Sequence, residues 1–308
     1  MTAPATSEAT ARAESQARLR ADGALMVLTL LWGTTFVVVK DALGHGDPFS
    51  FLAMRFTVGA AVLSVLAGRQ LLNPSYLRRG GVLGLFLFGG FALQTMGLTR
   101  TTPSRSAFIT GLSVLVVPVV LLALFRRVPR VSSLVGVVLS AVGLYYLTGA
   151  EVGLGVSSGD LLTFGCAVSY AFHIVFTERF ATKEGVQALV AVQLWVVALL
   201  SALCLPFTQV HVEWTPSFIG ATLFCGVFAS ALALSIQTWA QARTSAVRAV
   251  IIYSLEPVFA AAFSVVLGYE KLGAREWVGG GLIVLGVLAS ELGSALWERW
   301  RAREAARA

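Results

Sequence analysis

Apolar runs of about 20 residues alternate with short polar segments along most of the chain. A helix needs about 20 residues to cross the roughly 30 Å of hydrocarbon in a bilayer. The pattern therefore predicts an all-α integral membrane protein with ten transmembrane helices. The predicted spans are Ala24–Leu43, Phe49–Ala67, Gly80–Leu98, Ser104–Phe125, Val131–Gly149, Gly159–Thr177, Gln187–Phe207, Pro216–Thr238, Ser245–Leu267 and Trp277–Leu296.

Polar and turn-forming residues separate these spans. Helix stop signals stand at Gly44–Pro48, Asn73–Pro74 and Leu205–Pro206. Residues 1–23 are rich in Ala, Thr, Ser, Glu and Arg, and we expect them to form a disordered cytoplasmic tail. Residues 297–308 are expected to form a second, basic cytoplasmic tail.

The composition agrees with the bilayer as the solvent of this chain. Of the 308 residues, 56% are hydrophobic and 13% are charged, and the mean hydropathy is +0.79. The net charge of +7 would suggest a nucleic-acid partner for a soluble protein, but here the Lys and Arg residues lie in short loops beside apolar spans. We therefore expect the lipid bilayer, and no nucleic acid, as a partner.

Basic residues also predict the orientation, because Lys and Arg are retained on the cytoplasmic side. With the N-terminus inside, most of the 23 Lys and Arg residues fall in inner segments, and Arg55 falls within a span. The outer segments hold only Lys40, Arg100, Arg105, Lys271 and Arg275. We expect a multi-pass protein of the cell inner (plasma) membrane with both termini in the cytoplasm.

The two halves of the chain contain an internal repeat. At a shift of about 138 residues, Asp22 aligns with Asp160, Trp32 with Tyr170, Lys40 with Glu178 and Arg55 with Gln193. At a shift of about 143 residues, Gln94-Thr95 aligns with Gln237-Thr238, and Arg100-Thr101 with Arg243-Thr244. The predicted units are residues 24–149 and 159–296.

Each unit contains five predicted spans, so the second unit enters the membrane from the opposite side and the repeat is inverted. In secondary transporters, inverted repeats place a solute site near the membrane midplane and expose it alternately to each side. The repeat therefore favours a transporter.

Several short motifs carry a family resemblance over nearly the whole chain. They are Trp32-Gly33-Thr34-Thr35-Phe36 with Lys40, Met54-Arg55-Phe56, Leu255-Glu256-Pro257-Val258, and Leu267-Gly268-Tyr269-Glu270 before Gly279 and Gly286. The chain resembles the drug/metabolite transporter superfamily in its ten-helix EamA-type form. The resemblance implies a basket of ten helices around a central cavity, acting as an exporter of amino acids, metabolites or toxic compounds.

Glu256 is the strongest single candidate for a functional residue. It lies about 11 residues, or roughly 16 Å, into the ninth predicted span, where a carboxylate is costly unless it is protonated, paired or facing water. Pro257 removes a backbone donor beside it. Two interpretations stay open: a solute-binding or proton-coupling group, and a buried hydrogen-bond partner that joins helices.

Arg55 also has two interpretations. It is either a cation in the solute pocket or an anchor that extends from the helix end to the interface, and the sequence slightly favours the anchor.

Aromatic and polar residues complete the candidate set. Trp32, Phe36 and Lys40 share a helix face, and Tyr170, Ile174 and Glu178 repeat the spacing. The aromatic members can line a cavity or simply pack, while Lys40 and Glu178 are candidate gate or helix-end charges. Gln94 and Gln237 suit a zwitterion or an amide, or hydrogen bonds between helices. Tyr253 and His173 are further candidates, although a lone His in a span is more often structural.

Glycines at small-residue spacing crowd the fifth and tenth predicted spans and allow helices to approach closely. They are Gly136, Gly143, Gly279, Gly280, Gly281, Gly286 and Gly293. The resemblance implies that such helices can meet a second copy, so a homodimer is one expectation and packing within one chain is the other.

The alternative class is a membrane-embedded enzyme or sensor acting on lipid-linked or small hydrophobic ligands. The sequence has no His-Glu-x-x-His motif and no Walker-type Gly-x-x-x-x-Gly-Lys motif. Cys166, Cys204 and Cys225 lie in apolar runs without metal-ligand spacing. We therefore expect a non-enzymatic protein with a small-molecule solute, no metal and no cofactor.

Overall fold

The computed structural model describes residues 4–101, 103–148, 157–266 and 273–305. Within these ranges the regular structure is helical, and the only β pairing is an isolated bridge between Gly46 and Val212. Among the described residues, eight helical segments are long and apolar enough to cross a membrane. They are Ser15–Ala42, Pro48–Leu72, Pro74–Leu98, Ser106–Phe125, Ser158–Phe180, Val186–Phe207, Pro216–Gln241 and Ala246–Phe263.

These eight segments coincide with eight of the ten predicted spans, which confirms the all-helical membrane class. The fifth and tenth predicted spans coincide with two shorter apolar helices, Val131–Tyr146 and Trp277–Ser290. The predicted ends at Gly149 and Leu267 lie outside the described residues.

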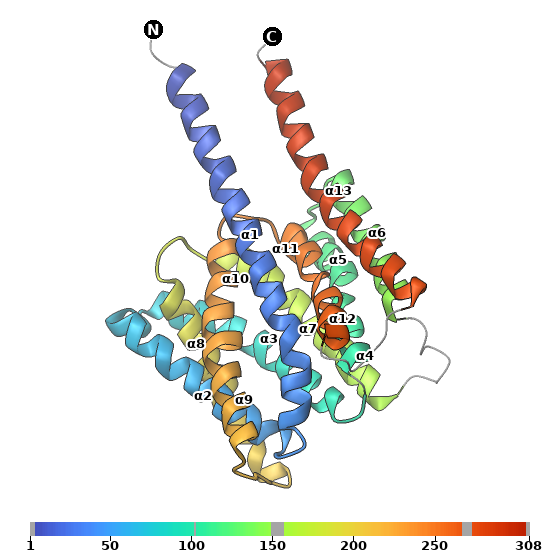
Figure 1. Cartoon of the computed structure of the whole chain (residues 1–308). Coiled ribbons are helices and arrows are strands. Elements are labelled where there is room, and N and C mark those ends of the chain that lie inside the picture. Colours follow the sequence, from blue (N-terminus) through green and yellow to red (C-terminus); the bar gives the residue numbers. More distant parts are fainter. Residues whose placement is uncertain (1–3, 102, 149–156, 267–272, 306–308) are drawn as a thin grey trace.

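The helices follow one another in the order shown in Figure 1. Their bounds are α1 Pro4–Ala42, α2 Pro48–Ala67, η1 Gly68–Leu72, α3 Pro74–Leu98, α4 Pro103–Gly111, α5 Ser113–Phe125, α6 Val131–Thr148, α7 Ser158–Phe180, α8 Val186–Cys204, η3 Leu205–Phe207, α9 Pro216–Gly226, η4 Val227–Leu232, α10 Ala233–Gln241, α11 Ala246–Tyr253, α12 Glu256–Val266 and α13 Ala274–Ala305.

The beginning of α1 and the end of α13 extend from the same end of the bundle, at the top of Figure 1. We call this the projecting end. The α1–α2 connection and the α8–α9 connection meet at the opposite end, where the bridge between Gly46 and Val212 joins them. Between the two ends, α2 packs along α8, α3 packs along α7 and α8, and α6 packs along α13.

The N-terminal segment differs from the disordered tail expected for residues 1–23. Helix α1 begins at Pro4 and continues without a break to Ala42. Ala, Glu, Gln and Arg are strong helix formers, so the helix of the first span extends beyond its apolar part. The expected tail at residues 297–308 differs in the same way, because α13 reaches Ala305.

Local sequence signals explain where several helices begin. Asp47 and Thr215 cap α2 and α9, and each is followed by a proline in the first helical turn. Ser157 and Asp160 form a capping box at the start of α7. Ser157 also lies in a Gly-x-Ser-x-Gly sequence, which is typical of hydrolase nucleophiles. Its hydroxyl oxygen instead accepts a hydrogen bond from the Asp160 N–H at 3.1 Å.

Two predicted spans are interrupted near their middle. The fourth is divided into α4 and α5 at Leu112, and the ninth is divided into α11 and α12 at Ser254–Leu255. Leu112 and Leu255 are related by the shift of about 143 residues that aligns Gln94 with Gln237. Each half of the chain therefore has an interrupted helix at a matching position.

Pro257 explains the second interruption. Proline has no backbone N–H, so it cannot donate to the carbonyl four residues earlier, at Tyr253. The Leu255 N–H bonds to the Ile252 carbonyl at 3.0 Å, three residues back, which tightens the chain before α12 begins at Glu256.

The eighth predicted span contains a π-helical segment, η4, between α9 and α10. Such segments are rare and occur often at functional sites.

The glycines of the fifth and tenth predicted spans pack against each other within this one chain. A Cβ atom on Gly136 would lie 2.8 Å from the Gly286 carbonyl oxygen, and one on Gly143 would lie 2.7 Å from the Gly279 carbonyl oxygen. Helices α6 and α13 therefore approach at backbone contact distance. Gly281 has no atom within 4 Å of its Cβ position, so it takes no part in this contact.

Candidate functional site

One cavity lies among the crossing helices and brings together nine residues from the predicted site. It encloses about 830 Å³ of space free of protein atoms, part of it open to the surroundings. The nine lining residues are Trp32, Phe36, Arg55, Gln94, Tyr170, His173, Gln237, Tyr253 and Glu256. We call it the central cavity.

Arg55 lies inside the bundle and does not extend to the interface, so the anchor interpretation is wrong. The residue is only 3% exposed. Its Nε donates to the Ser230 hydroxyl at 2.9 Å, and its guanidinium lies 5.2 Å and 4.8 Å from the ring centroids of Phe56 and Phe91. Ser230 lies in η4, so the π-helical segment helps to orient this cation beside the cavity.

Glu256 occupies the first position of α12, directly after the interruption of the ninth span. The unpaired N–H groups at a helix N-terminus stabilise a negative charge. Among the described residues, the Glu256 carboxylate has no hydrogen-bond partner. It lines the central cavity, where it is available to a bound solute.

Two further polar atoms in the cavity wall lack partners. The Gln237 amide oxygen and the Tyr253 hydroxyl are buried and make no hydrogen bond within the part of the chain that the structure describes. Gln237 uses its amide nitrogen to donate to the Gln241 side chain at 2.9 Å. Buried polar groups are nearly always paired, so these two atoms are exceptions among the residues that line the cavity.

Trp32 and Tyr170 both pack against the opposite half of the chain. The Trp32 indole donates to the Ala229 carbonyl at 3.1 Å, and its ring lies 5.5 Å from the ring of Tyr253. The Tyr170 ring packs edge-on against Phe91, with centroids 5.5 Å apart. Both aromatic residues therefore line the cavity and hold the two halves together.

Gln94 joins α3 to its neighbours as well as lining the cavity. Its amide nitrogen donates to the Thr110 hydroxyl at 3.2 Å, and its amide oxygen accepts from the Tyr170 hydroxyl at 3.5 Å. Phe36 lies in the cavity wall with 4% exposure.

His173 is paired inside the bundle. Its Nε2 hydrogen-bonds to the Gln193 side chain at 2.9 Å, and both residues are buried. This contact agrees with the structural interpretation of a lone histidine in a span.

Lys40 and Glu178 lie outside the central cavity, at the ends of other helices. The Lys40 ammonium donates to the carbonyls of Leu98 and Thr101, at the end of α3. Glu178 accepts from the Ala246 N–H at 2.8 Å, at the start of α11. The cation therefore meets a helix C-terminus and the anion meets a helix N-terminus, as the helix dipole favours.

Sequence reasoning missed the hydroxyl residues of the site. Thr35, Thr95, Thr110 and Ser113 line the central cavity, and Ser230 supports Arg55. Serine and threonine are common in membrane helices, where their hydroxyls bond to their own backbone. Thr35 lies in a family motif and Thr95 in the internal repeat, but Thr110, Ser113 and Ser230 had no such signal.

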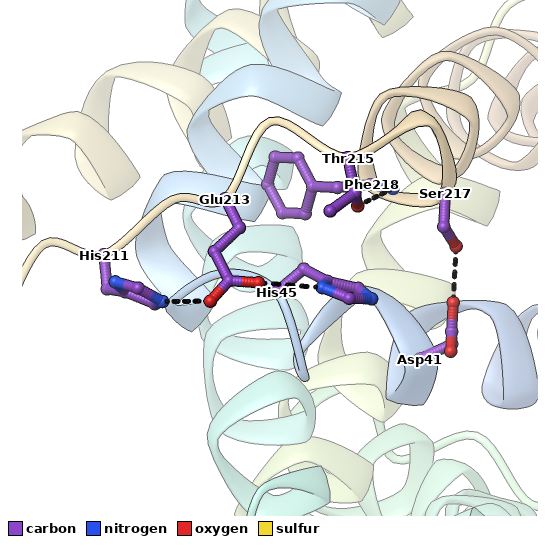
Figure 2. A network of polar contacts seen from close by, with 7 residues as sticks. All are labelled: Asp41, His45, His211, Glu213, Thr215, Ser217 and Phe218. Carbon is purple, nitrogen blue, oxygen red and sulfur yellow. Dashed lines mark hydrogen bonds and ion pairs between the residues drawn. The ribbon is translucent and has the colours of Figure 1, made fainter.

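A separate polar cluster joins the two loops at the opposite end of the bundle (Figure 2). His45 Nδ1 hydrogen-bonds to one Glu213 oxygen at 3.1 Å, and His211 Nε2 lies 3.4 Å from the other. The Ser217 hydroxyl donates to Asp41 at 2.6 Å. The hydrogen bond with His45, followed by that with His211, lowers the pKa of Glu213 below its usual value of 4.5.

Comparisons of the sequence with known proteins agree on one protein family. Residues 19–149 and 157–291 each match the EamA-like transporter family. An uncharacterized transporter of Archaeoglobus fulgidus is 33% identical over 281 residues, covering 91% of this chain and 88% of that protein. The uncharacterized inner membrane transporter YedA of Escherichia coli is 24% identical, covering 89% and 92% of the two chains.

A solved crystal structure shares the fold, with a TM-score of 0.74 at 24% identity, over 89% of this chain and 96% of the other. The apolar helices and the similarity to an inner membrane transporter make this a multi-pass membrane protein. The two family matches cover most of the chain, one in each half, and so the protein belongs to the EamA-like transporter family.

Proposed function

We propose that this protein is a secondary transporter that exports a small organic solute across the inner membrane by alternating access. The observation that carries the proposal is the central cavity, where nine aromatic, amide and charged side chains from both halves of the chain surround one space. A transport site of this kind lies between the two halves so that their relative movement exposes it to each side in turn.

Matched contacts support two inverted five-helix repeats. Trp32 contacts Ala229 and Tyr170 contacts Phe91, and the shift of about 138 residues relates both members of the first pair to those of the second. The interruptions at Leu112 and Leu255 correspond in the same way. An axis in the membrane plane would exchange these pairs, because each half contains an odd number of proposed spans.

The charges near the ends of the first helix of each half also correspond. Lys40 meets the end of α3, and Glu178 meets the start of α11. In an inverted pair of repeats, the equivalent positions face opposite membrane surfaces. The basic residues of the projecting end support a cytoplasmic location for both termini.

The cavity chemistry favours a zwitterionic solute with an apolar part. The Arg55 guanidinium suits a carboxylate. The Glu256 carboxylate and the unpaired Gln237 oxygen suit an ammonium group. Trp32, Phe36 and Tyr170 provide aromatic surface for the apolar part. An amino acid or a closely related metabolite has all three features.

The test is an efflux experiment in cells that lack competing exporters. The cells are loaded with amino acids as dipeptides, and the metabolites released to the medium are compared for wild type, Glu256→Gln and empty vector. Glu184→Gln is the matched control, because it makes the same change in an exposed loop away from the cavity. All variants are checked for equal amounts in the membrane.

We expect wild type and Glu184→Gln to release a zwitterionic solute, and Glu256→Gln to release at least tenfold less, which corresponds to about 1.4 kcal/mol. Equal release from Glu256→Gln and wild type would exclude Glu256 from binding and from proton coupling. Release equal to empty vector for every compound would contradict either the solute class or the export direction, and uptake by the same cells would distinguish the two.

A further inference from the structure

A second cavity lies at the projecting end of the bundle, in line with the central cavity. It borders the connection between α5 and α6 and the connection between α10 and α11, and encloses about 1250 Å³ of space free of protein atoms, part of it open to the surroundings. Glu178 and Gln241 line it, each about one helical turn along its helix from Ile174 and Gln237 of the central cavity. We call it the basic cavity.

Arginine dominates the lining of the basic cavity. Its five arginines are Arg18, Arg127, Arg130, Arg243 and Arg248, and its one acidic residue is Glu178. Arg248 also donates to Asp22 at 2.7 Å. Among the described residues that line the cavity, with Asp22 added, five positive charges stand beside two negative charges. A concave surface with this excess attracts anions.

Two of these arginines, Arg127 and Arg243, remain available to the cavity. The ion pair of Arg127 with Glu178, at 2.7 Å, leaves the arginine side chain 59% exposed. Arg243 places its guanidinium 4.4 Å from the ring centroid of Trp239 and donates to the carbonyl of that residue at 2.6 Å. These contacts orient the side chain without neutralising it, because neither partner carries a charge.

Hydroxyl groups stand among the arginines. Thr244 lines the cavity and is 7% exposed, and its hydroxyl oxygen has no hydrogen-bond partner among the described residues. Ser133 and Ser245 line the same space. Guanidinium groups bind phosphate oxygens through paired N–H donors, and Ser and Thr hydroxyls add further donors. Leaving a buried hydroxyl without a hydrogen-bond partner costs free energy, unless a bound ligand supplies the partner.

From the arginine cluster and the unpaired Thr244 hydroxyl, we propose that the basic cavity is a binding site for a phosphate-bearing anion. The phosphate belongs either to the headgroup of an anionic phospholipid or to a soluble phosphate compound. Basic cavities between helices at the membrane surface recognise lipid headgroups by this chemistry. The proposal does not depend on transport, since the site lies apart from the central cavity.

Binding to the purified full-length protein tests the proposal. One arm uses nanodiscs of phosphatidylcholine with or without phosphatidylglycerol, and counts the retained phosphatidylglycerol by native mass spectrometry. The other arm measures radiolabelled inorganic phosphate bound in phosphatidylcholine nanodiscs at constant ionic strength. The double variant Arg130→Gln/Arg243→Gln removes two charges from the cavity. The control Arg78→Gln/Arg79→Gln removes two charges from α3, outside the cavity.

We expect wild type and the control to bind one of the two probes, and the cavity variant to bind it at least tenfold more weakly. Thr244→Val keeps every charge and should weaken binding several-fold, so it provides the test if the double variant does not fold. Binding of phosphatidylglycerol alone identifies a lipid site, and binding of inorganic phosphate identifies a soluble ligand. Binding of neither probe, or an equal loss in cavity and control variants, would overturn the proposal.

Discussion

Arg55 of α2 donates to the hydroxyl of Ser230 in the π-helical segment at 2.9 Å, across the boundary between the two halves of the chain. The bond fixes a cation inside the bundle. Its partner lies in an irregular part of a helix, where the backbone geometry differs from that of an α-helix.

Replacing Ser230 with alanine should reduce stability by about 1–3 kcal/mol, because the buried Nε–H of Arg55 then lacks its acceptor. Thermal unfolding of the purified protein measures this loss. Ser235→Ala is the control, since that hydroxyl donates to the Ala231 carbonyl four residues earlier in the same span and its removal should change little. Equal effects of the two changes would mean that the Arg55 contact has no special role.

Gly90 provides a test of the position of Tyr170. A Cβ atom on Gly90 would lie 2.1 Å from the Tyr170 ring, so Gly90→Ala must push that ring out of its place in the cavity wall. We expect transport to fall at least several-fold. Gly81→Ala lies on the same helix with no atom near its Cβ position, and alanine there should stabilise the helix by up to about 1 kcal/mol without changing transport. A normal flux for Gly90→Ala would exclude the Tyr170 ring from the transport path.

The contact between α6 and α13 predicts that two glycine substitutions differ in their effect on stability. Gly143→Val should separate the helices and cost about 1–3 kcal/mol, because its Cβ would lie 2.7 Å from the Gly279 carbonyl oxygen. Gly281→Val faces open space and should cost well under that amount. Thermal unfolding in detergent compares the two variants. A larger loss at Gly281 would point to contact with a second copy of the chain through that face.

The loop cluster of Figure 2 predicts an acid-dependent change in stability. The pKa of Glu213 is lowered in the folded protein, so the folded state favours the carboxylate. Its contribution is present above the usual value of 4.5 and is lost as the pH falls through the lowered value. The melting temperature of wild type should therefore exceed that of Glu213→Gln at neutral pH, and the difference should vanish in acid. The effect should be small, because the cluster is exposed. A difference that stays constant down to pH 3 would contradict this origin.

The sequence predicted the helices well because the bilayer imposes a simple rule on length and hydrophobicity. It also predicted the members of the central cavity, since an ionisable residue such as Glu256 or an aromatic residue such as Trp32 stands out within an apolar span. The matching interruptions at Leu112 and Leu255 were harder to foresee. Only the second has a proline close behind it.

Arg55 shows why the rest needed coordinates. Its distance from the helix end allowed it to extend to the interface, and only the position of Ser230, 175 residues away in the chain, shows that it turns inward. A contact between distant segments leaves no local pattern in the sequence. The same holds for the basic cavity, whose arginines come from three separate stretches of the chain.

The interruption before Glu256 also bears on how the chain enters the membrane during synthesis. Helix α11 has 8 residues and α12 has 11, which gives lengths of about 12 Å and about 16 Å. Neither can cross the bilayer by itself, so the two must enter together. Backbone groups without hydrogen bonds at the junction are then unfavourable in lipid unless neighbouring helices cover them. Helix α1 packs directly after this junction, where Gly33 lies against Phe259 and the Glu256 carbonyl. The packing of Gly33 thus covers the first turn of α12 in the folded protein.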